Sequence, residues 1–208
     1  MIRWLYPGSW RARLVRLGWL DDRAAQLVEF AVSLPVLVLF VVGIFDFSSA
    51  FTLKQKLTNI ARDAARVAAA DPANDLTQPQ TPLPASVADA LQVVDNYLQA
   101  NKINDCGIGG TPTPAGLTWT FTANGNGCPA GGITLLINRG YYFPQTGAVL
   151  PTVSCTSQPV PNNQITIVAT CVSIQYTYQW RFGRVASLFG TTTLPSALTA
   201  IGVAMNEN

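Results

Sequence analysis

The chain contains no histidine and few charged residues. Without histidine it has neither a Ser-His-Asp triad nor an imidazole ligand for a metal. Charged residues make up 12% of the 208 positions, about half of the roughly 25% that soluble domains carry. The formal net charge of +2 is too small to indicate nucleic-acid binding. The balance therefore favours membrane contact or an exported, weakly charged surface.

Motifs that carry enzymatic chemistry are also missing. The chain has no P-loop, and Gly107-Ile108-Gly109-Gly110 is too short for a nucleotide-binding fingerprint, so we expect a loop there. Apart from Asp21-Asp22, the acidic residues are scattered singly. A carboxylate pair brought together only by folding stays open as an alternative. We expect no enzyme, no cofactor and no metal site.

The chain has four cysteines, none of them in a C-x-x-C pair: Cys106, Cys128, Cys155 and Cys171. An even number in a region rich in Gly, Pro and Thr favours disulfides in an oxidising compartment over a zinc site. Three connectivities are open. We prefer Cys106–Cys128 with Cys155–Cys171, because each bond then closes a local loop and stabilises the fold by about 3 kcal/mol. Four reduced, buried thiols are the alternative.

The run from Phe30 to Phe45 carries no charged residue. A bilayer core needs roughly 20 residues of helix, so we extend the span to about residues 25–47. Glu29 and Asp46 then lie near the lipid headgroups, where a carboxylate costs little. A membrane helix tolerates Pro35, with a kink. A buried core helix and a cleaved secretory signal are the alternatives; the run is too long for the second.

Basic residues gather before the span: Arg3, Arg11, Arg13, Arg16 and Arg23. This bias predicts a cytoplasmic N-terminus and an exported C-terminal part, in agreement with the disulfide prediction. We divide the chain into a basic leader (1–23), a membrane helix with an amphipathic extension (24–70) and an exported domain (71–208). The leader either rests on the inner leaflet as a helix or is disordered.

The helix is expected to continue beyond the membrane to Ala70, because Phe51–Ala70 contains neither Gly nor Pro. Apolar residues recur there at spacings of three or four: Leu53, Leu57, Ile60, Ala61, Ala64 and Ala68. Asp71-Pro72 ends the run. The result is a stalk with a narrow apolar stripe that needs a packing partner.

The exported part begins with a Pro-rich linker (72–85) and a helix over Ser86–Asn101, for which Ser86 and Asp89 have capping-box spacing. A loop is expected over 106–116 and a short helical turn over 185–189. Alternating apolar and polar residues predict strands at 117–122, 133–143, 165–182 and 191–205, with a bend near Gly140 and an interruption of the last strand near Pro195. Tyr176, Tyr178 and Trp180 are expected in the core rather than in a ligand site. A small antiparallel sheet with one apolar face can bury the stripe of the stalk, which predicts an α+β domain.

Residues 23–70 resemble the TadE-like family, the minor pseudopilins of the tight-adherence (Flp) pilus. The resemblance covers about a quarter of the chain, and the order and spacing of its motifs agree together. The motif residues are Ala24, Glu29-Phe30, Pro35, Gly43-Ile44-Phe45-Asp46-Phe47, Gln55-x-Leu57, Ala61-Arg62 and Ala65-Arg66.

The resemblance implies a pilin-like fold and a single-pass protein of the inner membrane that assists pilus assembly. Its partners would be membrane lipid, other pilin or pseudopilin subunits and a prepilin peptidase. The peptidase would cut between Ala24 and Ala25, and Glu29 would pair with the new N-terminal ammonium of a neighbouring subunit. The family usually has glycine where this chain has Ala24.

A structural, non-enzymatic subunit of a Tad-type pilus or a related secretion machine is therefore the leading hypothesis. A membrane-anchored adhesin or ligand-binding domain that never assembles is the first alternative. A membrane-tethered enzyme, with acids clustered in a cleft of the folded domain, is the second.

Overall fold

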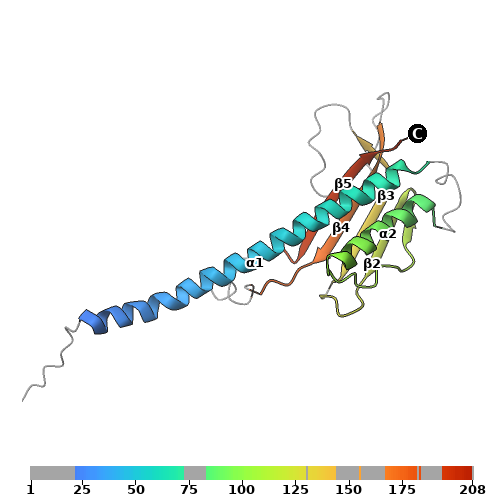
Figure 1. Ribbon diagram of the computed structural model, residues 1–208. Helices are drawn as coiled ribbons and strands as arrows, with labels where there is room; N and C mark the ends of the chain where they lie inside the picture. The colour runs from blue at the N-terminus through green and yellow to red at the C-terminus, as the bar shows by residue number, and fades with distance from the viewer. Residues whose placement is uncertain are drawn as a thin grey trace, which may run out of the picture. The chain divides into compact units, whose positions relative to one another are not determined.

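The computed structural model describes residues 22–72, 83–129, 131–143, 155, 167–181, 183 and 194–207. Its elements are α1 (Asp22–Ala70), α2 (Ala85–Ala100), β1 (Thr113–Ala115), β2 (Thr118–Ala123), β3 (Ile133–Phe143), β4 (Ile167–Thr177) and β5 (Ala197–Met205) (Figure 1). This α+β architecture confirms the predicted fold class. The basic leader before residue 22, most of the Pro-rich linker and the helical turn predicted at 185–189 lie outside the described residues.

The strands form one antiparallel sheet in the order β1-β2-β3-β4-β5, so each strand pairs with its neighbour in sequence. In the middle of the sheet Ile137 is opposite Val172, and Val172 is opposite Gly202. The register between β3 and β4 shifts between Asn138 and Tyr141. This irregularity lies where Gly140 predicted a bend. Between the paired positions β3 has two residues and β4 has one, which is the pattern of a β-bulge in β3.

The chain divides into two compact units, residues 1–43 and 44–208. Within the second unit, the C-terminal part of α1 and the whole of α2 cover the same face of the sheet (Figure 1). The stripe predicted on the stalk is buried there, together with side chains of α2 and of strands β2 to β5: Leu57, Ile60, Ala61, Ala64, Ala68, Val94, Leu98, Trp119, Leu135, Ile174 and Ala200. The apolar face of the sheet and the stripe of the helix thus bury each other, as expected.

Small residues let α1 lie close to the sheet. Gly202 of β5 faces the helix at Ala61, and a Cβ atom on Gly202 would overlap the backbone of Ala61 and Arg62. Ala61, Ala64 and Ala68 are fully buried. The close approach therefore depends on a helix face of alanines opposite a strand position without a side chain.

The opposite face of the sheet carries a second, smaller cluster. Successive residues of a strand point to opposite faces, and Tyr141, Ala169 and Cys171 pack there with Cys155. The disulfide Cys155–Cys171 lies in this cluster with a Cα–Cα distance of 5.5 Å. Asn138 Nδ2 donates a hydrogen bond to the Cys155 carbonyl at 2.7 Å.

The other disulfide, Cys106–Cys128, joins the loop after α2 to the turn between β2 and β3, with a Cα–Cα distance of 5.3 Å. Both bonds follow the pairing that the sequence favoured, and the described chain contains no free cysteine. Asn126 and Gly127, in the Asn-Gly turn beside Cys128, have positive φ of 54° and 71°. A left-handed pair of this kind is what that dipeptide predicts.

Three local predictions are wrong. The N-cap of α2 is Pro84, without a side-chain cap hydrogen bond, so Ser86 is not the cap; it lies buried in the first turn. The segment expected to be loop after Cys106 contains strand β1. Strand β4 ends at Thr177 rather than at residue 182, so the chain leaves the sheet five residues earlier than predicted.

Candidate functional site

The N-terminal part of α1 exposes a continuous apolar surface. Phe30, Val32 and Leu37 are 62%, 68% and 63% exposed. The most apolar stretch of the helix has a mean hydropathy of 2.6, and none of it is buried by the described residues. Moving each such side chain out of water contributes about 1.5–3 kcal/mol. In the described part of the chain, this is the one helix long and apolar enough to cross a membrane.

Glu29 is the one charged residue between Ala25 and Phe45, and it is exposed on α1. No basic side chain in the described ranges forms an ion pair with it. An exposed carboxylate inside an apolar surface is available to a cationic partner from outside the chain. Its role in assembly stays a prediction.

The residues of the predicted cleavage point lie in the first turn of α1, because the helix begins at Asp22. Ala24 is helical in its backbone, and Ala25 is exposed. Terminal turns of helices fray readily, so a peptidase would meet this bond in the least stable part of α1. Cleavage between Ala24 and Ala25 stays a prediction.

Pro35 and Gly43 lie inside α1 as the sequence predicted. Pro35 has no N–H to donate to the carbonyl of Ala31, so the helix loses one hydrogen bond there. A Cβ atom on Gly43 would meet nothing within 4 Å. In the described structure, then, no close contact requires a glycine at position 43.

Asp46 follows the apolar run directly and is only 4% exposed. The Tyr178 hydroxyl donates a hydrogen bond to Asp46 Oδ1 at 2.9 Å. The next residue, Phe47, has its ring centroid 5.2 Å from that of Trp180. Trp180 in turn meets Tyr178 edge to face at 5.0 Å, and its Nε1–H donates to the Pro195 carbonyl at 2.7 Å. We refer to Phe47, Tyr178 and Trp180 as the aromatic cluster.

The environment of Tyr178 raises the pKa of its hydroxyl. Burial is the main cause, followed by the hydrogen bond and the negative charge of Asp46, while the Arg181 charge opposes them. The shift favours the protonated hydroxyl, which is the form that donates the hydrogen bond to Asp46. The sequence placed Asp46 near the headgroups, which stays a prediction, and both aromatic residues in the core; in the structure Tyr178 and Trp180 are half-buried and contact Asp46 and Phe47 of α1 instead.

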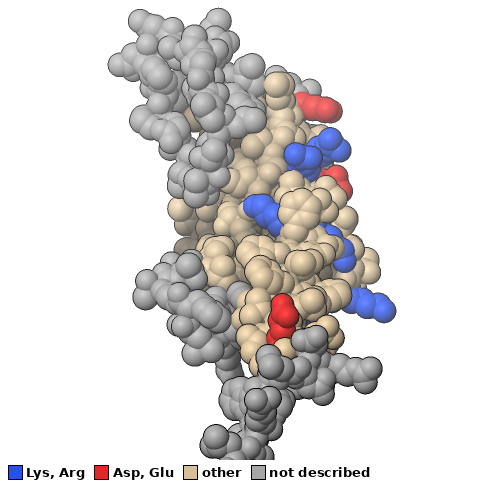
Figure 2. Space-filling view, turned by 90° about the vertical axis from the view of Figure 1, so that its left-hand side faces the viewer, with Lys and Arg blue, Asp and Glu red and all other residues tan. Residues whose placement is uncertain are grey.

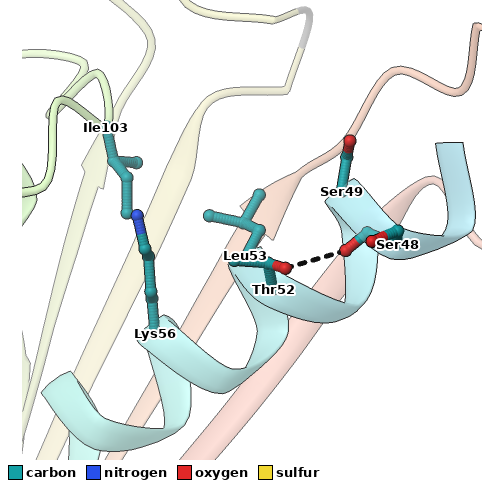
Figure 3. A pocket seen from close by; sticks show the side chains of 6 residues that line it. All are labelled: Ser48, Ser49, Thr52, Leu53, Lys56 and Ile103. Carbon is teal, nitrogen blue, oxygen red and sulfur yellow. Dashed lines mark hydrogen bonds between the residues drawn. The ribbon is translucent and has the colours of Figure 1, made fainter. Parts of the chain in front are cut away.

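Beside this cluster lies an open pocket of about 330 Å³, lined by Ser48, Ser49, Thr52, Leu53, Lys56 and Ile103 (Figure 3). The Ser49 and Thr52 hydroxyls donate to the carbonyls of Phe45 and Ser48, both at 2.9 Å. Lys56 extends from α1 toward Ile103 (Figure 3). The lining offers one cation and no nucleophile paired with a base.

Charged side chains are sparse over the face of the molecule seen in Figure 2, where most of the described surface is neither basic nor acidic. Among the described residues, no group of three or more Asp, Glu or Cys side chains is placed to hold a metal ion. The features that stand out are therefore the exposed apolar helix with Glu29, and the contact of Asp46 and Phe47 with the segment after β4.

A comparison with protein families finds that residues 24–66 match the family model described as TadE-like protein. A comparison with curated proteins finds no match, and a comparison with solved structures finds none either. The matched residues contain the exposed apolar surface, Glu29, Asp46 and most of the helix stripe that packs on the sheet. Residues 24–66 of the N-terminal helix are thus similar to the TadE-like family model, and the rest of the chain lies outside the match.

Proposed function

We propose that this protein is a structural, non-enzymatic subunit that assists the assembly of a Tad/Flp-type pilus or a related secretion machine. The observation that carries the proposal is the coincidence of the TadE-like match with an apolar helix whose surface the other described residues leave uncovered. Such a surface requires lipid before assembly and neighbouring subunits after it.

In this proposal α1 spans the inner membrane once, with the N-terminus in the cytoplasm and the disulfide-bonded domain on the far side. The arginines before the helix favour this orientation. The two disulfides favour an oxidising compartment for the domain. Prepilin peptidase would remove the leader before Ala25, and Glu29 would then pair with the terminal ammonium of a neighbouring subunit.

The substitution Glu29→Gln tests the proposal because it keeps the size of the side chain and removes its charge. Removing one partner of a desolvated ion pair destabilises the contact by about 3–5 kcal/mol. We therefore expect pilus output to fall at least about tenfold. Pili counted by electron microscopy, in a strain that carries the variant as its sole copy, give the measurement.

The chain offers a matched control, because its only other glutamate is the exposed Glu207 at the C-terminal end. Glu207→Gln should leave pilus output unchanged, and both variants should stay in the membrane fraction. Normal pili with Glu29→Gln would remove this carboxylate from the mechanism. Membrane-bound monomers that cross-link to no pilus component would favour the adhesin alternative.

A further inference from the structure

The apolar run of α1 ends at Phe45, and the two residues that follow it contact the segment after β4. We propose that the aromatic cluster, together with Arg181, lies in the headgroup layer of the membrane, so that the exported domain is seated directly on the lipid surface. The inference rests on the membrane anchoring of the proposed function and adds the lipid surface as a binding partner of the domain itself.

The first argument is depth along the helix. A helix rises 1.5 Å per residue, so Phe47 lies about 3 Å beyond the end of the apolar run. The headgroup region on each side of a bilayer is about 5–8 Å thick. The uncharged run alone is about 24 Å long, shorter than a hydrocarbon core of about 30 Å, so the span covers about residues 25–47 and Phe47 lies at its end. Because the Trp180 ring centroid is 5.2 Å from that of Phe47, this span brings Trp180 to the boundary between the hydrocarbon core and the headgroups.

The second argument is chemical. Tryptophan and tyrosine are enriched at membrane interfaces because one end of the ring is apolar and the other is polar. Trp180 and Tyr178 each use their polar group in a hydrogen bond, to Pro195 and Asp46 respectively. Phe47 and Phe51 remain 57% and 64% exposed. Apolar surface thus continues past the acid that closes the apolar run.

The third argument is charge. Asp46 would be unfavourable beside anionic lipid, but it is buried against Tyr178. Among the described residues of the segment after β4, Arg181 is an exposed cation next to Trp180 in sequence, whereas Lys54 and Lys56 are half-buried on α1 about 11 and 14 Å beyond Phe47. Basic groups at this level attract lipid phosphates at about 1 kcal/mol each.

The polar residues of the same turns are compatible with contact with lipid. Ser49 and Thr52 donate their hydroxyl hydrogens to carbonyls of the preceding turn, at 2.9 Å in each case. A hydroxyl satisfied within its own helix loses little on contact with lipid.

Tryptophan fluorescence in vesicles tests the inference. The full-length chain is prepared with Trp4, Trp10 and Trp19 replaced by Phe, so that Trp119 and Trp180 remain. A matched chain carries Trp180→Phe in addition, and the difference between the two spectra reports Trp180 alone. Trp119 is 1% exposed in the core and serves as the unquenched internal control. Both chains are reconstituted in phosphatidylcholine–phosphatidylglycerol vesicles.

We expect lipids brominated close to the headgroup to quench the Trp180 signal at least about twofold more than lipids brominated near the bilayer centre. Aqueous acrylamide should quench it weakly. Strong acrylamide quenching without lipid quenching would place the domain away from the membrane and overturn the inference. Protection from both quenchers would assign the cluster to a protein contact and also overturn it.

Flotation of the vesicles separates this inference from the proposed function. A chain that floats with the vesicles but shows no quenching by lipid contradicts the seating alone. A chain that does not float contradicts the membrane anchoring and, with it, the seating.

Discussion

Arg139 is fully buried, and it supplies the positive charge that the end of α1 lacks. The last turn of α1 contains no basic residue, although the carbonyl end of a helix favours a cation. Arg139, from β3, donates through Nη1 to the Ala68 carbonyl and to Thr170 Oγ1, the latter at 2.9 Å. Its Nη2 donates a hydrogen bond to the Asp71 carbonyl at 3.0 Å. One side chain therefore joins the sheet to the helix terminus.

Replacing Arg139 by Met should lower the free energy of unfolding by about 2–4 kcal/mol, because buried carbonyls lose a charged donor. Guanidinium denaturation of the full chain in detergent, followed by fluorescence, gives the value. Arg66→Met is the control. The Arg66 side chain is 75% exposed, and its distance of 3.8 Å from Asp63 is long for an ion pair, so the free energy of unfolding should change by less than about 0.5 kcal/mol. Equal losses in the two variants would contradict the role of Arg139.

Asp105 organises the turn that carries Cys106. Its Oδ1 accepts a hydrogen bond from the Gly107 N–H at 3.1 Å, and this bond is the main cause that lowers the pKa of Asp105 below 3.8, with burial opposing it. Cys106 and Gly107 both have positive φ there, 58° and 75°. A charged acceptor holds this strained turn in place.

A carboxyl whose pKa is lower in the folded state stabilises the fold above its unfolded pKa, and the stabilisation is lost as pH falls through the folded pKa. We therefore expect Asp105→Asn to reduce the fall in stability measured below about pH 4. Denaturation midpoints recorded from pH 6 down to pH 2 give the comparison, with Asp89→Asn, on an exposed position of α2, as the control. Parallel curves for Asp105→Asn and the unmodified chain would disprove this role.

At the scale of elements, the packing of α1 on β5 depends on the absence of a side chain at position 202. Gly202→Ala should lower the free energy of unfolding by about 1–3 kcal/mol, because the new methyl group would overlap the backbone of Ala61 and push the elements apart. Thermal unfolding followed by circular dichroism measures the effect. Gly109→Ala, whose Cβ would meet nothing within 4 Å, should change stability by less than about 0.5 kcal/mol.

The elements themselves were largely predictable, because periodicity and turn residues are local signals. The stripe on α1, the bounds of α2 within one residue and the irregularity near Gly140 all follow from short stretches of sequence. The cap of α2 was missed because Pro84 supplies a fixed backbone rather than a side-chain acceptor.

The contacts of the candidate site could not be predicted in the same way. Tyr178 and Trp180 continue the alternation of β4, and nothing near them in sequence indicates that the chain leaves the sheet at Thr177. Their partners Asp46 and Phe47 lie more than a hundred positions earlier. Only the packing of α1 on the sheet brings the two segments together, as it brings Arg139 to the end of α1.

At the scale of the whole molecule, the core is confined to the second unit. Every residue of both buried clusters, and every cysteine, comes after Ile44. A chain that begins at Ile44 should therefore form both disulfides and unfold cooperatively without lipid. Peptide mapping by mass spectrometry and guanidinium denaturation check this. A gradual, non-cooperative transition would mean that the first unit is needed for folding.

The alanine face of α1 has a consequence for protein engineering. The TadE-like match ends at residue 66, and every strand lies beyond it. Nevertheless, the sheet packs on four residues of the matched segment: Leu57, Ile60, Ala61 and Ala64. This face of α1 is thus the packing surface of the sheet. A foreign antiparallel sheet can be grafted onto it if its edge strand brings a glycine to the place opposite Ala61.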